Sequence, residues 1–209
     1  MNSHSPARRP QSPAWARIFE TATRLFYAEG VHAVGIDRII AEAGVAKATF
    51  YHHFRSKDDL VRAYIVEQSR QQRRLVEESA AATPRETLLL AFQKMCEFGA
   101  EPTYRGCAFI NTAAEYPDPA HPVRQAIDEH RDWNRRLFRD LLAAEGHPDS
   151  ARTAEILMLL KDGLAVGFDL DDPESVGIAA REAVTRVVDG GNDRSFGTRT
   201  EGSISAFMP

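Results

Sequence analysis

The sequence has 209 residues and a formal net charge of −4, with 43% of its residues hydrophobic and 27% charged. This composition is ordinary for a globular protein and excludes a collagen-like, a disordered or a membrane-spanning chain, since apolar stretches such as residues 156–160 fall far short of the roughly 18 residues that a membrane helix needs. No apolar signal segment follows Arg8 and Arg9, and Cys96 and Cys107 suit a reducing compartment, so we expect a cytoplasmic protein without a membrane partner.

The two ends of the chain differ in charge. Residues 1–66 carry nine lysines and arginines against six acidic residues, a balance of +3, whereas the remaining residues carry a balance of −7. A basic end on an acidic body is typical of a protein that contacts phosphate groups at one end only. This charge difference is modest, and it supports phosphate binding only together with the motif in the same segment.

The N-terminal part of the chain predicts an arm followed by helices. Residues 1–13 contain three prolines, three serines and two arginines, a composition typical of a flexible arm. From Ala14 apolar residues recur every three or four positions until Gly30, which predicts an amphipathic helix. Two shorter helices are expected over residues 36–43 and 47–54.

The rest of the chain is also predicted to be helical. Ser56 and Asp59 resemble the capping box that begins a helix, and this helix would run to about residue 79. Five further helices are expected over residues 85–98, 106–115, 122–145, 151–167 and 174–188. The Gly-, Ser- and Thr-rich residues from 190 onward predict a mobile tail. The sequence shows no alternating strand pattern and no internal repeat, so the predicted fold class is all-α.

The segment from Gly35 to Phe54, GIDRIIAEAGVAKATFYHHF, carries the most specific pattern. It predicts two short helices joined by a three-residue turn that begins at Gly44, where glycine favours a left-handed backbone. Such a pair of helices can place the second one in the major groove of DNA. The second helix begins with Lys47, Ala48 and Thr49, a cation beside small side chains that let the backbone approach DNA closely.

Residues 14–65 resemble the DNA-binding domain of the tetracycline-repressor (TetR) family. The matching residues are Phe26-Tyr27-Ala28-Glu29-Gly30, Ile36, Ile39, Ala43-Gly44-Val45, Thr49-Phe50-Tyr51, His53-Phe54, Lys57 and Leu60. Many matches spread over about fifty residues are more specific than a lone short motif. The resemblance implies an all-helical homodimer with a three-helix, helix-turn-helix domain that binds DNA. It also implies a larger helical domain whose ligand usually releases the DNA.

This resemblance organises the chain into four parts. We expect a flexible arm over residues 1–13, a DNA-binding domain over 14–66 with its motif at 35–54, an effector-binding and dimerisation domain over 67–189, and a mobile tail over 190–209.

The resemblance also assigns roles in DNA binding. Lys47, Ala48 and His52 are expected to face base edges, and the residues expected to hold phosphates are Thr49, Tyr51, His53 and Lys57. Gly35 departs from the family's usual Thr or Ser, whose hydroxyl can cap the second helix and reach a phosphate. Ile40 replaces a usual alanine between the two helices. A plain solvated lysine is the alternative for Lys57.

The C-terminal half offers candidates for a pocket that combines apolar residues with a few polar anchors. They are Phe92, Met95, Cys96, Phe109, Asn111 and Glu115. The alternative, that these residues pack a core and cap a helix, fits the same helical spacing. We expect no cofactor and no metal, because the spacing of Cys107, Glu115, His121 and His130 matches no compact ligand motif. No pattern of catalytic residues predicts an enzyme.

The last two helices are expected to form the dimer interface. The candidates are Leu157, Leu160, Leu164, Val184 and Val187. Two such helix pairs stacked across a two-fold axis form a four-helix bundle. The alternative is that this apolar surface faces its own subunit.

Two functions from different classes remain open at this point. The first is a ligand-responsive transcriptional regulator, with repression inferred from the habit of the family. Its partners would be palindromic operator DNA, a second copy of the chain and an unidentified small molecule. The alternative is a small-molecule-binding protein or enzyme whose N-terminal helices are structural. Sequence-specific, salt-sensitive retardation of the DNA flanking its own gene would separate the two.

Overall fold

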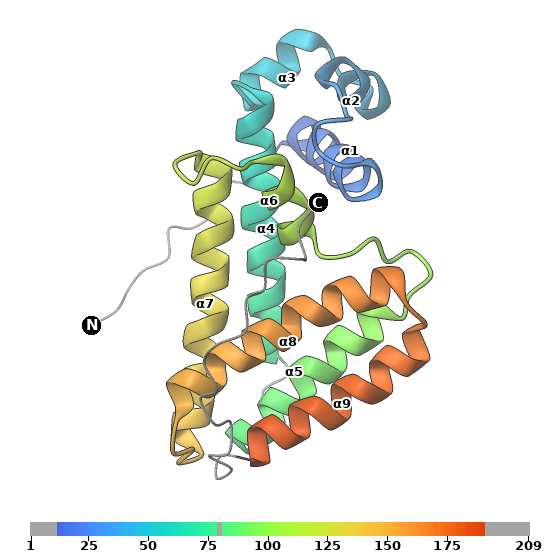
Figure 1. Ribbon diagram of the computed structural model, residues 1–209. Coiled ribbons are helices and arrows are strands. Elements are labelled where there is room, and N and C mark those ends of the chain that lie inside the picture. The colour runs from blue at the N-terminus through green and yellow to red at the C-terminus, as the bar shows by residue number, and fades with distance from the viewer. Residues whose placement is uncertain (1–11, 79–80, 191–209) are drawn as a thin grey trace, which may run out of the picture.

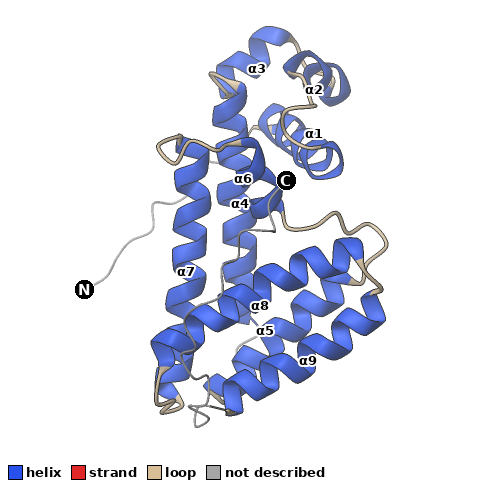
Figure 2. Cartoon of the chain, viewed as in Figure 1, coloured by secondary structure: helices blue, strands red, loops and turns tan. Residues whose placement is uncertain are grey.

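The computed structural model describes residues 12–78 and 81–190, and within them the chain forms helices and no strands (Figure 2). The helices are α1 (Pro13–Glu29), α2 (Ile36–Ala43), α3 (Lys47–His53), α4 (Lys57–Glu78), α5 (Pro84–Gly99), α6 (Ala108–Glu115), α7 (Pro122–Ala144), α8 (Ser150–Leu170) and α9 (Pro173–Asp189). The predicted all-α fold is confirmed. Most of the predicted arm (residues 1–11) and of the predicted tail (191–209) lies outside the described residues.

Side-chain caps determine where most of these helices begin. The residues that accept a backbone N–H at a helix start are Ser12 for α1, Thr83 for α5, His121 for α7, Asp149 for α8 and Asp172 for α9. At the start of α4, Ser56 Oγ accepts the N–H of Asp59 at 3.1 Å, as its spacing predicted.

Two helix boundaries differ from the predicted ones by more than a residue. Helix α6 begins at Ala108 rather than at Gly106, because Gly106 has a φ of 77° and Cys107 occupies the extended cap position. Helix α8 continues past Gly167 to Leu170, since the Gly167 carbonyl still accepts the N–H of Asp171 at 2.8 Å.

Helices α1–α3, here called the head, pack against the first turns of α4. The residues buried in this core are Ile18, Ala22, Leu25, Ile39, Phe50, Leu60 and Tyr64. The same core continues into α6 and α7 through Phe109, Val123 and Ile127. Figure 1 shows the head at one end of α4, with α6 between the head and the rest of the molecule. The shared core therefore connects the head to the remaining helices.

Helices α5, α7, α8 and α9, here called the body, form a second core. Its buried residues include Leu88, Phe138, Leu142, Leu157 and Val184. Helices α4 and α7 run side by side, and α8 packs on both α7 and α9 (Figure 1). No helix in the described part of the chain combines the length and the apolar character needed to cross a membrane.

Candidate DNA-binding surface and ligand cavity

A tight turn sets the angle between α2 and α3. Gly44 adopts φ 61° and ψ 43°, the left-handed conformation expected for it, and its N–H bonds to the Ala41 carbonyl at 3.2 Å. Buried Ile39 and half-buried Val45 pack in the core between the two helices. The segment therefore has the connectivity and the turn of a helix-turn-helix.

Helix α3 presents one face to solvent and buries the other. Phe50 is fully buried, and Phe54, four residues later, is 5% exposed. The exposed residues of α3 are Lys47, Ala48, Tyr51 and His52, whereas Thr49, His53 and Lys57 are half-buried. The predicted base-facing residues thus share the open face of the helix, and their contacts with DNA stay a prediction.

Three of the predicted DNA-contacting side chains have partners within the head and α4. The Lys47 ammonium lies 3.2 Å from Asp37, but both side chains are well exposed, so this ion pair is weak and easily exchanged for a phosphate. His53 Nε2 lies 3.1 Å from Ser12 Oγ. Lys57 Nζ donates to the His32 carbonyl at 3.3 Å, and burial lowers the pKa of this lysine.

A charged network links α1 to α2. The Arg38 guanidinium donates to Glu29 and to Glu42, and Arg24 donates to the other oxygen of Glu42. These hydrogen bonds raise the pKa of Arg38 and lower the pKa values of both glutamates. The network joins two arginines and two glutamates on the solvent side of the head, where their contribution to stability is screened.

Glu115, at the C-terminal end of α6, holds the loop between α1 and α2. One carboxylate oxygen accepts the Val31 N–H at 2.7 Å, the other accepts the His32 N–H, and the latter also lies 3.6 Å from His32 Nδ1. The sequence pattern suggested an effector pocket for Glu115. The structure places it 84 residues along the chain from Val31, as a contact between α6 and the head.

Two tyrosines also connect the segment around α6 to its neighbours. One contact is made with the head and the other with the start of α4. Tyr27 of α1 donates to the Gly106 carbonyl at 3.2 Å and accepts the Arg105 N–H at 3.0 Å. Tyr116 donates to Asp58 Oδ1 at 2.8 Å. The segment from Arg105 to Tyr116 is therefore bonded to the head or to the start of α4 at both of its ends.

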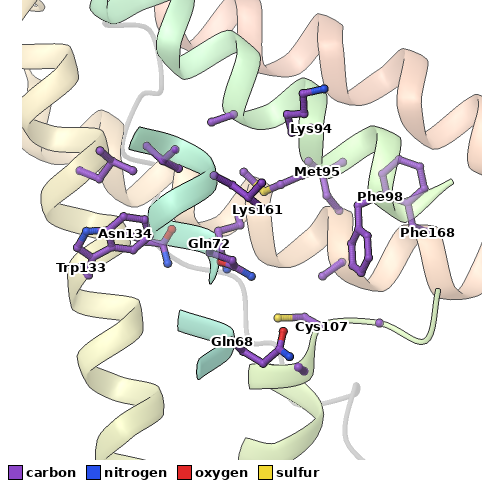
Figure 3. Close-up of a pocket in the computed structure, with 18 of the residues that line it drawn as sticks. Gln68, Gln72, Lys94, Met95, Phe98, Cys107, Trp133, Asn134, Lys161 and Phe168 are labelled. Atoms are coloured by element: carbon purple, nitrogen blue, oxygen red, sulfur yellow. The ribbon is translucent and has the colours of Figure 1, made fainter. Parts of the chain in front are cut away.

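A cavity of about 220 Å³ lies between α4, α5, α7, α8 and the start of α6 (Figure 3). The residues lining it are Tyr27, Gln68, Gln72, Leu75, Val76, Thr87, Ala91, Lys94, Met95, Phe98, Tyr104, Gly106, Cys107, Ala108, Trp133, Asn134, Leu137, Phe138, Lys161, Leu164, Ala165 and Phe168. Most of them are apolar or aromatic, and a few polar groups interrupt this surface. Such a cavity is typical of a small-molecule site, although it is smaller than the roughly 300–1,000 Å³ of sites for drug-sized ligands.

Of the six residues predicted for an effector pocket, only Met95 lines this cavity. Phe92, Cys96 and Phe109 point into the cores and are at most 7% exposed. Asn111, which donates to the Arg105 carbonyl at 2.7 Å, and Glu115, which holds the α1–α2 loop, line a second pocket between α1 and α6 instead. The helical spacing identified apolar positions but did not separate those facing a cavity from those facing a packed core.

Both cysteines are free, and their surroundings differ. Cys96 is buried, and burial raises the pKa of its thiol, which makes it a poor nucleophile at neutral pH. Cys107 is half-buried at the cap of α6 and lines the cavity. Across the described part of the chain, no group of three or more His, Cys, Asp or Glu side chains lies together in a way that could hold a metal ion.

His130 is a buried imidazole next to the cavity. Its Nδ1 lies 3.0 Å from Ser69 Oγ, its Nε2 lies 2.9 Å from the Asn134 amide nitrogen, and its ring stacks on Phe109 at 3.7 Å. Burial is the main cause that lowers the pKa of His130 to about 3, and the positive charges of Lys161, Arg73 and Arg131 lower it further. The imidazole is therefore neutral at physiological pH.

This neutral histidine predicts that the protein loses stability in mild acid. Its pKa is below the unfolded value of about 6.5, so the unfolded chain binds more protons between about pH 6.5 and pH 3. The contribution of His130 to the free energy of unfolding is complete above about pH 6.5. It decreases by about 1.4 kcal/mol per pH unit as the pH falls below that value. The free energy of unfolding, measured by urea denaturation between about pH 6.5 and pH 5, should fall with pH at this slope. In His130→Gln the slope should correspond to about one proton fewer taken up on unfolding. A slope unchanged in His130→Gln would contradict this account, and His52→Gln, which removes an exposed histidine, is the control.

The predicted dimer residues lie partly inside the subunit. Leu157 and Val184 are 0% and 2% exposed and belong to the core of the body, and Leu160, Leu164 and Val187 are half-buried against it. A different set of apolar side chains is open to solvent on α8 and α9. This exposed apolar face consists of Ile156, Leu159, Val166, Leu170 and Ile178.

Residues 18–64 match the family model described as bacterial regulatory proteins, tetR family. The chain is 41% identical to SCO4454, a TetR-family transcriptional regulator from Streptomyces coelicolor, and their structures agree with a TM-score of 0.83 over 88% of this chain and 98% of that one. It is 28% identical over 122 residues to the HTH-type transcriptional regulator LmrA of Bacillus subtilis, a match covering 56% of this chain and 65% of LmrA. The match therefore spans slightly less than two thirds of this curated relative. The transcriptional regulator FadR from Bacillus subtilis, solved in complex with stearoyl-CoA, shares the fold, with a TM-score of 0.66 over 84% of this chain and 98% of that one at 20% identity.

Proposed function

Because the chain belongs to the TetR family of DNA-binding transcriptional regulators, we propose that it is a dimeric repressor that a small molecule releases from its operator. As a regulator of this family it is not an enzyme, which excludes the alternative of a catalyst with structural N-terminal helices. Repression, dimerisation, release by a ligand and a cytoplasmic location are parts of the proposal.

The observation that carries the proposal is the open face of α3. Lys47, Ala48 and His52 are exposed together at the end of the head, while Phe50 anchors the opposite face of the helix in the core. The small side chain of Ala48 lets the helix backbone approach base edges closely, and Lys47 and His52 supply hydrogen-bond donors there. Thr49, Tyr51, His53 and Lys57 lie around this face, in positions suited to phosphate contacts.

The exposed apolar face supports the dimer. Four of its side chains, Ile156, Leu159, Val166 and Leu170, recur along α8 at intervals of three, seven and four residues, so they form one stripe. Large exposed apolar patches on a monomer mark interaction sites. A second copy packed on this stripe and on Ile178 would form a four-helix bundle, as predicted for the last two helices. The contacts would be made by the exposed apolar face and not by the predicted residues, which pack inside the subunit.

The cavity and the segment around α6 support the release by a ligand. Gly106, Cys107 and Ala108 line the cavity, whereas Glu115 and Tyr116 at the other end of α6 bond to the α1–α2 loop and to α4. A ligand that displaces the start of α6 would move Glu115, and with it the head. In the dimer this motion would change the separation of the two α3 helices, which must be roughly 34–36 Å to enter successive major grooves.

Substitutions on α3 and α4 test the DNA-binding part of the proposal. With the DNA flanking its own gene as probe, Lys47→Ala and His52→Ala should narrow the difference in affinity between cognate and random DNA by roughly tenfold, because each lost base contact is worth about 1–3 kcal/mol. Lys57→Ala should weaken binding to cognate and to random DNA about equally. It should also reduce the slope of affinity against salt concentration by about one released ion. Lys94→Ala, in the body, is the control. Unchanged affinity and specificity in Lys47→Ala would contradict the assignment of base-facing residues.

A further inference from the structure

Lys161 is a charged residue in an apolar position. It lies on α8, one turn after Leu157 and one turn before Leu164, on the face that packs into the body. The residue is 8% exposed and lines the cavity. Removing a lysine from water is unfavourable unless an anion compensates it, so the compensation of this charge requires explanation.

The nearest carboxylate does not compensate Lys161 fully. Lys161 Nζ lies 3.3 Å from Asp162 Oδ1, but both oxygens of Asp162 already accept hydrogen bonds from the Arg131 guanidinium, at 3.1 and 2.7 Å. The two cations lower the pKa of Asp162 even though its burial acts in the opposite direction, so the carboxylate carries one negative charge. One negative charge therefore faces two positive ones, and this group of three residues is cationic.

The other groups around the cavity do not supply the missing anion. The described residues that line the cavity include two lysines and no aspartate or glutamate. The second lysine, Lys94, is half exposed and pairs with Glu97 at 2.7 Å, so it differs from Lys161 in both burial and partner. Figure 3 shows Lys161 among Met95, Gln72 and the aromatic side chains Trp133 and Phe98, which belong to the same cavity lining.

From this arrangement we propose that the cavity binds a compact aromatic or apolar carboxylate, whose anionic group pairs with Lys161. The inference rests on the proposed function, since it names the chemical class of the effector. The carboxylate supplies the negative charge that Asp162 shares with Arg131, and Gln68 and Gln72, which line the same cavity, add polar N–H groups to the site. The aromatic walls contact the body of the ligand, and the volume of about 220 Å³ limits its size.

Three probes of nearly the same shape and different charge test this proposal. We would titrate the full-length protein with 1-naphthoate, with the neutral 1-naphthamide and with the cationic 1-naphthylmethylamine by isothermal calorimetry at pH 7.5. The wild type should bind the naphthoate at least tenfold more tightly than the other two. Lys161→Met, which keeps the length of the side chain and removes the charge, should abolish this preference. The control Arg152→Met, at an exposed position of the same helix outside the cavity, should keep it.

The outcomes separate this inference from the proposed function. Equal binding of all three probes to the wild type, or an unchanged preference for naphthoate in Lys161→Met, would overturn the carboxylate assignment and leave an effector cavity in place. Binding of none of the three would overturn the effector cavity itself, and the carboxylate assignment with it.

The unfolding of the ligand-free variants gives a second readout. A lysine retained for ligand binding is unfavourable for folding, so Lys161→Met and Lys161→Gln should melt at the same temperature as the wild type or above it. A melting temperature lowered by several degrees in both variants would assign Lys161 a structural role instead and contradict the proposal.

Discussion

Replacing Leu159 by arginine should convert the proposed dimer into folded monomers and reduce operator affinity by more than a hundredfold. Leu159 is 72% exposed in the subunit and lies in the exposed apolar face, so an arginine there is harmless to the monomer but would be buried without a partner in the dimer. Two half-sites are bound together only while the subunits are joined, and losing that linkage commonly costs a factor of about 10²–10⁴.

Sedimentation velocity at micromolar concentration, together with circular dichroism, would distinguish dissociation from unfolding. Val184→Arg should unfold the body instead, because Val184 is 2% exposed within its core. Leu75→Arg, the same type of change at a leucine of α4 that is 59% exposed, should leave the dimer intact. If Leu159→Arg and Ile178→Arg both remained dimeric, the interface would lie elsewhere.

Replacing Glu115 by alanine should weaken operator binding at least tenfold and remove most of its response to a cavity ligand. The change leaves the N–H groups of Val31 and His32 without their acceptor, and Val31 is 1% exposed. Hydrogen bonds to a charged group are worth about 1.5–3 kcal/mol each, so the head would lose a substantial part of its attachment to α6. With this attachment weakened, the two α3 helices would hold their separation less firmly.

Fluorescence anisotropy with labelled operator would measure both effects. Glu115→Gln keeps one acceptor and loses the charge. Its operator affinity and its response to the ligand should lie between those of the wild type and of Glu115→Ala. Glu129→Ala removes an exposed glutamate of α7 and serves as the control. A Glu115→Ala protein that binds the operator tightly and still responds to the ligand would show that the coupling does not pass through α6.

The sequence predicted the helices well, because their signals are local. Apolar residues at three- and four-residue intervals, the cap at Ser56 and the glycine at position 44 all act within one or two turns of the chain. The helix-turn-helix could be identified for the same reason, since it consists of two short helices and the turn between them.

The sequence did not predict which apolar residues face outward. Helix α8 is apolar on two sides, so Leu157 and Leu159 look alike in the sequence, although the first is buried in the subunit and the second is open to solvent. The role of Glu115 depends on a loop 84 residues earlier, a contact that no local pattern indicates. The cavity is formed by side chains of six helices, α1 and α4 to α8, and could be located only from their packing.

Lys161 is a functional candidate that the sequence interpretation missed, although its position carries a signal. It stands at a point of α8 where the spacing of Leu157, Leu164 and Phe168 favours an apolar side chain. A charged residue at such a position is usually either paired or functional, so the helical spacing by itself marks Lys161 as a candidate.

The most direct test of the central claim is the affinity of the wild-type protein for its operator, measured with and without 1-naphthoate at a concentration that calorimetry shows to saturate the cavity. If the cavity controls the head, the ligand should weaken operator binding by about 5- to 150-fold, and the operator should weaken naphthoate binding by the same factor. Equal operator affinity in the presence and absence of the bound ligand would contradict the account.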